Sequence, residues 1–167
     1  MTQYVDVEIY ADIICPWCYI SKKRLDAAFA ARPHVTPRYI WRCFLLNPTM
    51  PSAGMDRQAY LIGKFGNAAK AVYGRINDAG LESGIAFNFD RIKRTPDSRK
   101  THRYLLAAAA KGHDLSDAFF KAYFIDGRDI GDDDELAKIA HEQGFTIDPV
   151  SLADPALDRQ IANDIEM

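Results

Sequence analysis

The feature that most constrains this chain is a pair of cysteines separated by two residues, in the stretch D-I-I-C-P-W-C-Y-I at positions 12–20. An apolar run precedes the pair and a helical pattern follows it, so Cys15 falls at a strand-to-helix junction and Pro16 takes about the first helical position. A thiolate there faces unpaired backbone N–H groups and the positive end of the helix dipole, which lowers a thiol pKa. Cys18 lies one turn further on the same face. The spacing therefore favours a nucleophile with a resolving partner, as thiol–disulfide exchange requires.

Two other interpretations of the pair each lack a feature that they need. A disulfide framework in a small secreted protein uses more cysteines than the three present here, and an even number. A zinc site needs four ligands, and neither Cys43 nor any histidine forms a second paired motif. The histidines are His34, His102, His113 and His141. Two inert core thiols are the last alternative, and we predict a redox pair and no metal site.

Four residues near the pair are candidates for supporting roles. Pro16 stiffens the start of the helix, and Trp17 adds a flat apolar surface beside the reactive sulfur. Asp12 ends the preceding strand, where it either assists proton transfer or is simply a hydrogen-bonded acid, the reading that the residues alone favour. His102 lies among apolar residues of a helix, where packing or surface exposure is the simpler explanation. Cys43, alone on a strand, is expected to be a small core residue, with a redox role left open.

The first third of the chain reads as strand, helix, strand. Residues 5–14 alternate between apolar and polar and then become apolar, which predicts a strand that is more buried towards its end. Helical spacing from Pro16 predicts a helix of about four turns that ends near Pro33. Residues 35–46 read as a second strand. The three elements form a βαβ unit, which is expected to be right-handed.

The rest of the chain reads as almost wholly helical. After a Pro- and Gly-rich loop, residues 56–84 show helical spacing with glycines that mark a bend. Ser116 is expected to be an N-cap, and glycines close several of the helices. The further helices are expected at 99–112, 115–127, 132–144 and 154–167.

The composition excludes several classes of function. The 167 residues suit one domain with an inserted subdomain, and 48% hydrophobic residues can form a core. A net charge of -2 gives no electrostatic footprint for nucleic acid. No apolar run is long enough to cross a bilayer. The N-terminal residues lack the charged region and the cleavage site of a signal peptide, so a cytoplasmic location is the expectation.

Beyond these patterns, the chain resembles a known family. The resemblance is carried, in order, by "DIICPWCYISKKRLDAA", "WRCFLLNP", "KFG", "THRYLLAAAAKG", "LSDAFFKAYF" and "DIGDDDELAKIAHEQG". These segments resemble the FrnE-like branch of the DsbA family of thioredoxin-fold oxidoreductases and, more distantly, 2-hydroxychromene-2-carboxylate isomerases and kappa-class glutathione transferases. The resemblance implies an α/β thioredoxin-like fold with a large all-helical insertion. It divides the chain into a βαβ half with the CPWC motif at 1–54, the insertion at 55–150 and a return to the thioredoxin domain at 151–167.

The resemblance also implies a function. It implies a thiol–disulfide oxidoreductase in which Cys15 attacks and Cys18 resolves, acting on protein or low-molecular-weight thiols and disulfides. The family has no resident cofactor, although glutathione is a candidate co-substrate. His102 gains weight as a site residue, because its segment borders the active-site cleft in relatives. Two alternatives stay open: a glutathione-dependent isomerase or transferase, and a non-catalytic chaperone-like or binding domain.

The chain departs from the family pattern most clearly at its C-terminal end. No stretch matches the cis-proline loop, the last two strands and the last helix of a thioredoxin domain, so we expect this second half to be missing. Cys43 also stands where the family usually has proline. Without the second half, the first strand has an unpaired apolar edge. Either the chain is truncated, or a partner chain or a second copy covers that edge.

Overall fold

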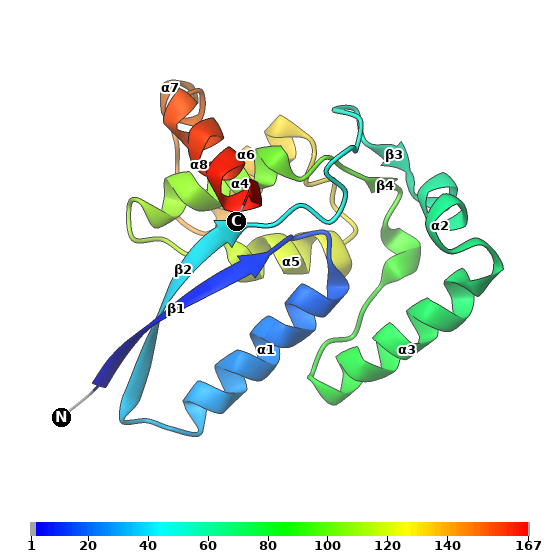
Figure 1. The fold of residues 1–167 in the computed structure, drawn as a ribbon, viewed down its shortest axis with the longest axis horizontal. Coiled ribbons are helices and arrows are strands. Elements are labelled where there is room, and N and C mark those ends of the chain that lie inside the picture. Colours follow the sequence, from blue (N-terminus) through cyan, green and yellow to red (C-terminus); the bar gives the residue numbers. More distant parts are fainter. Residues whose placement is uncertain (1–2, 167) are drawn as a thin grey trace.

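The structure, a computed structural model, describes residues 3–166 and shows a mixed α/β fold (Figure 1). Strand β1 (Gln3–Ala11), helix α1 (Pro16–Ala30) and strand β2 (Val35–Cys43) form the predicted strand–helix–strand unit. The two strands pair in parallel, and the register places Ala11 opposite Cys43. The expectation of a thioredoxin-like βαβ unit is therefore confirmed in its elements and its order.

Strand β2 ends three residues earlier than the sequence pattern predicts. The Phe44 N–H still donates to the Ala11 carbonyl at 3.2 Å, so the ladder reaches this point. The ladder does not continue beyond this bond, because the Leu46 N–H donates to the Asp12 carboxylate at 2.8 Å. A side chain thus replaces the neighbouring strand as the hydrogen-bond acceptor, and the strand stops there.

The remaining elements confirm the helical character of the chain, with one correction. The predicted insertion is not all helical, because β3 (Met55–Asp56) and β4 (Arg94–Thr95) form a two-residue antiparallel pair within it. Strands of two residues are too short to show an alternating pattern, which is why the sequence did not indicate them. The elements are β3 (Met55–Asp56), α2 (Arg57–Phe65), η1 (Gly66–Ala68), α3 (Ala69–Glu82), η2 (Phe89–Arg91), β4 (Arg94–Thr95), α4 (Arg99–Ala109), α5 (Ser116–Phe124), α6 (Asp133–Glu142), α7 (Pro149–Leu152) and α8 (Pro155–Glu166).

The backbone conformation tests two local predictions, the bend within residues 56–84 and the N-cap at Ser116. The bend expected within residues 56–84 occurs at Gly66, whose φ of +53° ends α2 in a conformation that favours glycine. Ser116 is not an N-cap: it is the first helical residue of α5, and Leu115 precedes it as the cap. The Asp114 carboxylate accepts the Ser116 N–H at 2.8 Å, so a different side chain satisfies the start of this helix.

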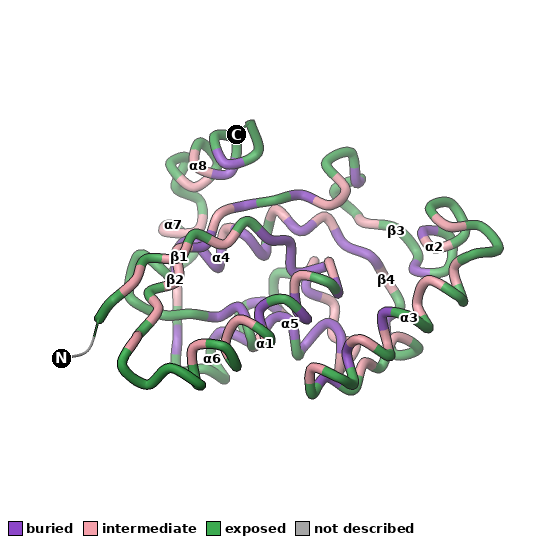
Figure 2. The backbone as a smooth tube through the Cα atoms, turned by 60° about the horizontal axis from the view of Figure 1, so that its bottom comes forward, coloured by how far each residue is buried: buried purple, intermediate pink, exposed green. Residues whose placement is uncertain are grey.

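The hydrophobic core lies where α1 meets the helical block. Phe119, Phe120, Tyr123 and Phe124 of α5 are all at most 1% exposed. The ring of Tyr19, from α1, stacks on Phe120 with centroids 4.8 Å apart. In Figure 2 buried residues predominate along α4 and α5, whereas most residues of α2 and α8 are exposed. The core therefore holds the helix that carries the cysteine pair against the rest of the molecule.

The sheet itself is small. Within residues 3–166, β1 pairs with β2 alone, and every peptide bond is trans. Helix α1 packs against β2 and α5, and α4 and α8 pack against β2 and against each other. No helix in the described part of the chain is long and apolar enough to span a membrane. The division of the chain at residues 54 and 150 stays a prediction.

Candidate active site

The geometry of the site begins with the backbone at Cys15. Cys15 is the N-cap of α1, with an extended backbone (φ -96°, ψ 113°), and Pro16 follows as the first helical residue. The Cys15 N–H donates to the Asp12 carbonyl at 3.0 Å, and the Cys15 carbonyl accepts the Cys18 N–H at 3.1 Å. Both cysteines are half-buried free thiols. The predicted junction therefore places a thiol at the start of a fifteen-residue helix.

The two sulfurs differ in their acidity. A hydrogen bond from the Cys18 thiol, together with the smaller effects of the backbone N–H groups of Cys18 and Trp17, lowers the pKa of Cys15 from 9.0 to about 7. Burial and the charge of Asp12 oppose this effect. The same thiol–thiol bond, together with burial and the Cys15 charge, raises the pKa of Cys18 far above its usual range. At neutral pH Cys15 is thus the sulfur that ionises, and Cys18 keeps its proton.

Asp12 joins two segments at the site. Its carboxylate is fully buried, and it accepts the Ile14 N–H at 3.2 Å and the Leu46 N–H at 2.8 Å. The first bond shapes the turn that leads to Cys15, and the second ties that turn to the segment after β2. The expectation of a hydrogen-bonded acid at a strand end is confirmed, and the acid lies close enough to Cys15 and Cys18 to raise the pKa of each.

His102, on α4, also lies close to Asp12. Its side chain is buried, and its Nε2 atom lies 3.7 Å from the nearer Asp12 carboxylate oxygen. In the part of the chain that the structure describes, this Nε2 has no hydrogen-bond partner. The structure therefore brings His102 and Asp12 together, and the interpretation of His102 as a surface residue is wrong.

Trp17 and Cys18 border a small groove. The groove has a volume of about 220 Å³ and lies between β1 and α1, with Ile9 on one wall and Lys22 on the other. Trp17 is 47% exposed, as expected for a surface next to a reactive sulfur. Sequence reasoning missed Lys22, a lysine with only 5% of its side chain exposed. Its partner Asp26, 2.8 Å away and four residues along the helix, was the available signal.

Cys43 differs from the pair in its burial and in the acidity of its thiol. It is 1% exposed, and burial followed by the charge of Asp12 raises the pKa of its thiol to about 12. A thiol in this state is protonated at neutral pH and is a poor nucleophile. The expectation that Cys43 is a small core residue is confirmed.

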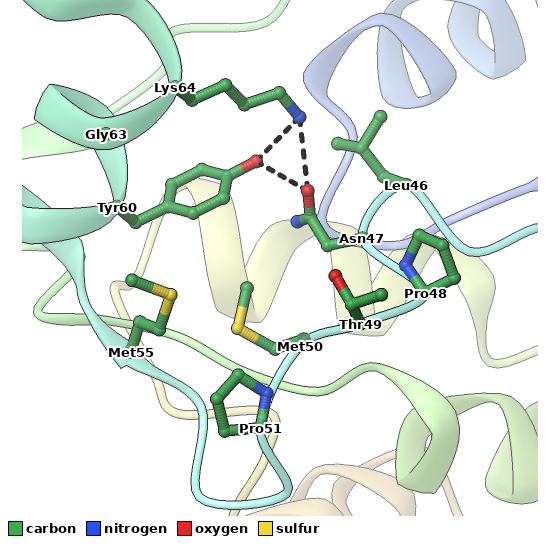
Figure 3. Close-up of a pocket in the computed structure, with 10 residues that line it drawn as sticks. All are labelled: Leu46, Asn47, Pro48, Thr49, Met50, Pro51, Met55, Tyr60, Gly63 and Lys64. Atoms are coloured by element: carbon green, nitrogen blue, oxygen red, sulfur yellow. Dashed lines mark hydrogen bonds between the residues drawn. The ribbon is translucent and has the colours of Figure 1, made fainter.

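A second pocket is lined in part by Leu46, whose N–H donates to the Asp12 carboxylate. It has a volume of about 430 Å³ and lies between the segment after β2 and helix α2 (Figure 3). Asn47, Tyr60 and Lys64 form a hydrogen-bonded cluster at its rim. These residues fall within or near the sequence segments "WRCFLLNP" and "KFG", to which sequence reasoning gave no role. In residues 3–166, no group of three or more His, Cys, Asp or Glu side chains is arranged to hold a metal ion.

A parallel βαβ unit with a CPWC motif at the start of its helix, followed by a mostly helical block, defines a thioredoxin-like thiol protein. The family model for the DSBA-like thioredoxin domain matches residues 6–166, and the chain belongs to this family. The resemblance to the DsbA family is therefore confirmed, and its narrower FrnE-like assignment stays a prediction. Because the match extends to residue 166, it does not confirm that the second half of the domain is missing.

Known proteins agree with this assignment. The crystal structure of a probable DsbA oxidoreductase, SCO1869 from Streptomyces coelicolor, is 30% identical, with a TM-score of 0.81 over 96% of this chain and 73% of that chain. The cytosolic disulfide reductase DsbM from Pseudomonas aeruginosa, in a structure with GSH, shares the fold at 18% identity, with a TM-score of 0.62 over 96% of this chain and 77% of that one. The uncharacterized protein YwbO from Bacillus subtilis is 26% identical over 145 residues, or 84% of this chain and 67% of that protein. The likeness supports a thiol–disulfide oxidoreductase at the level of the family.

Proposed function

We propose that this protein is a thiol–disulfide oxidoreductase in which Cys15 is the attacking cysteine and Cys18 the resolving one. The observation that carries the proposal is the unequal acidity of the two sulfurs at the start of α1. The Cys15 pKa of about 7 leaves about half of this thiol ionised at neutral pH. Cys18, held protonated, is protected from competing reactions until the first step is complete.

The proposed reaction proceeds in two balanced steps. The Cys15 thiolate attacks one sulfur of a substrate disulfide, forming a mixed disulfide and releasing one substrate thiolate. Cys18 then loses its proton and attacks the Cys15 sulfur, which releases the second substrate thiol. The substrate gains two electrons and becomes two thiols, while the Cys15–Cys18 pair loses two electrons and becomes a disulfide. The reverse sequence oxidises a substrate dithiol.

The buried acid and imidazole suggest how Cys18 loses its proton. Asp12 lies close enough to affect both cysteine pKa values, and His102 lies 3.7 Å from the Asp12 carboxylate. We propose that this pair accepts the Cys18 proton during the second step, because an ionisable group near the reacting atom supports proton transfer. Pro16 and Trp17 shape the surface around the sulfurs in this proposal.

The acidity of Cys15 also suggests the direction of exchange. Strong disulfide donors lower this pKa to about 3.5, whereas thioredoxin-like reductants have values of about 7. The Cys15 value of about 7 supports reduction or isomerisation rather than strong oxidation. We therefore propose a cytoplasmic protein that acts on protein or low-molecular-weight disulfides with glutathione as co-substrate. DsbM, a cytosolic disulfide reductase with the same fold, is consistent with this proposal.

The free edge of β1 supports a further part of the proposal. Within residues 3–166 this strand pairs only with β2, although a strand with an unpaired edge invites another strand to add to it. We propose that an additional strand completes the sheet in the working protein. It belongs either to further chain of this protein or to a partner, which includes a second copy.

An alkylation-trapped redox titration against glutathione buffers, read by intact mass, tests the central proposal. We expect Cys15 and Cys18 to titrate as one two-electron couple with a potential between about -200 and -270 mV. The Cys43→Ser variant is the control and should titrate in the same way. Cys18→Ser should instead accumulate a mixed disulfide with glutathione. A wild-type pair that never closes contradicts the proposal, and a persistent glutathione adduct on it favours the glutathione-dependent transferase or isomerase.

A further inference from the structure

A cavity lies at the side of the molecule where α4 contacts both α6 and α7 (Figure 1). Its volume is about 600 Å³, which falls in the range of about 300–1,000 Å³ that is usual for small-molecule sites. None of its lining residues borders the groove at Cys18 or the pocket lined by Leu46. The cavity is therefore separate from the site of the proposed thiol chemistry.

One wall of the cavity is apolar. Ala137 of α6, Ile147 before α7 and Leu152 of α7 contribute carbon atoms to it. Ile147 and Leu152 also pack against the main hydrophobic core, so the core fixes this wall in place. An apolar group placed against the wall is removed from water, which favours its binding.

The hydroxyl of Tyr104, on α4, is the polar group that the core presents to this cavity. Tyr104 is 5% exposed, and its ring meets Phe119 of α5 edge-on, with centroids 6.2 Å apart. Within residues 3–166 the Tyr104 hydroxyl makes no hydrogen bond. A buried hydroxyl without a partner is unfavourable unless water or a ligand bonds to it. This group is therefore available to a bound molecule.

The two cations that line the cavity already have partners. The Lys100 ammonium lies 2.7 Å from the Asp133 carboxylate. The Arg103 guanidinium pairs with Asp158 and also donates to the Leu152 carbonyl at 2.8 Å. An anionic ligand would have to compete with these partners for either cation, so the lining does not favour an anion.

One carboxylate of the lining has no cationic side chain paired with it. Asp134 lies in the first turn of α6 and forms no ion pair within the described residues. Burial, followed by the charges of Asp133 and Asp134, raises the pKa of Tyr104, so these carboxylates make the potential at its hydroxyl negative. A protonated amine suits this end of the cavity, because it donates to a hydroxyl oxygen and is attracted to a carboxylate.

We infer that this cavity binds a small amphiphilic amine. The ammonium group lies at Tyr104 and Asp134, and the apolar group lies against Ile147 and Leu152. A neutral or anionic molecule of the same shape lacks the attraction to Asp134 and binds more weakly. The binding is noncovalent and does not involve the cysteine pair, so this inference and the proposed thiol–disulfide exchange can each fail alone.

An NMR titration of the isotope-labelled, reduced protein tests the inference with three probes that differ at one end. The probes are cationic phenethylamine, neutral phenethyl alcohol and anionic phenylacetate. At neutral pH we expect phenethylamine to shift the amide signals of α4, α6 and α7, with a Kd on the order of 1 mM, as suits so small a ligand. The other two probes should bind about fivefold more weakly, the size of an exposed ion pair.

Four variants assign the binding to named side chains. Tyr104→Phe should weaken phenethylamine about tenfold by removing a hydrogen bond to a charged group, while the thermal unfolding of the free protein does not fall. Asp134→Asn should weaken phenethylamine about fivefold and leave phenethyl alcohol unchanged. Asp78→Asn, at an exposed position of α3 outside the cavity, is the matched charge control. Ala137→Phe places a ring at the cavity wall and should weaken every probe. Circular dichroism confirms that each variant is folded.

Several results would overturn the inference. The site fails if none of the probes shifts the amides of α4, α6 and α7 at about 10 mM, well above the expected Kd. The assignment to an amine fails if the three probes bind equally, or if Asp134→Asn and Asp78→Asn weaken phenethylamine to the same extent. The redox titration of the cysteine pair is a separate measurement, and its result leaves this site unaffected.

Discussion

At the residue scale, the acidity of Cys15 depends on a balance of local groups. The Cys18 thiol and two backbone N–H groups stabilise the thiolate, whereas burial and the Asp12 carboxylate oppose it. The result is a pKa of about 7, below the free-thiol value of 9.0. The Cys18 thiol and the Asp12 carboxylate belong to different residues, so each of these two contributions is open to a separate substitution.

The pH profile of Cys15 alkylation tests this balance. Because the thiolate is the reactive form, the rate should rise with pH around a midpoint of about 7 in the wild-type protein. Cys18→Ala removes the largest stabilising contribution and should shift the midpoint upward. Asp12→Asn removes an opposing charge and should shift it downward. Iodoacetamide rates between pH 5 and pH 10, with the modified residue located by peptide mass, give the midpoints.

Two variants control that experiment. Cys18→Ser keeps a hydroxyl donor near Cys15, so its midpoint should fall between those of the wild type and Cys18→Ala. Cys43→Ser should leave the midpoint unchanged, because the Cys43 thiol is not among the groups that shift the Cys15 pKa. A wild-type midpoint near 9 would show that the start of α1 does not activate the thiol.

At the scale of elements, α8 is attached to β2 through one carboxylate. Asp164 has 4% of its side chain exposed, and it accepts the Cys43 N–H at 2.8 Å. The Arg42 guanidinium lies 3.6 Å from its other oxygen. This contact secures the last helix to the end of the strand that pairs with β1, and Ile161 packs beside Cys43 in the same small cluster.

Removal of this carboxylate should weaken the whole fold. We expect Asp164→Ala to lower the free energy of unfolding by about 1–3 kcal/mol, because it leaves the buried Cys43 N–H without an acceptor. Asp158→Ala, on the same helix, removes an exposed ion pair with Arg103 and should cost less than about 1 kcal/mol. Urea unfolding of the reduced proteins measures both. Equal losses for the two variants would contradict the anchoring role of Asp164.

At the scale of the molecule, the helices form an extensive hydrophobic core, whereas the sheet that contains β1 has two strands in the described residues. The largest buried side chains belong mainly to the helices, whereas the pair of strands leaves β1 with an unpaired edge in the described residues. Tyr4, near the start of β1, is 62% exposed. The helical block therefore supplies most of the packing, and the sheet is the part of the molecule open to further association.

The open edge predicts association that depends on concentration. We expect sedimentation velocity to show larger species as the protein concentration rises, since an uncovered edge strand pairs with other strands. Hydrogen exchange should then slow at the β1 amides that do not bond to β2, and not at those of α5. A monomer at every concentration, with fast exchange at those β1 amides throughout, would argue against pairing between copies.

Features determined by neighbouring residues were readable from the sequence alone. The cysteine pair, the strand before it and Pro16 after it lie within one short stretch, so alternation and helical spacing were sufficient to place them. The same holds for most helices, whose patterns repeat every three to four residues. The break after α2 was also indicated, because Gly66 permits a backbone conformation that other residues avoid.

Contacts between distant residues were decided only by the tertiary structure. Asp12 and Leu46 lie 34 positions apart, and Cys43 and Asp164 lie 121 apart. No periodic pattern relates such positions, since the packing of whole helices and strands sets their separation in space. The same reason applies to His102 beside Asp12 and to Lys64 beside Asn47. The sequence by itself therefore determined the reactive pair and its local setting, while packing decided which acids, amides and cations surround it.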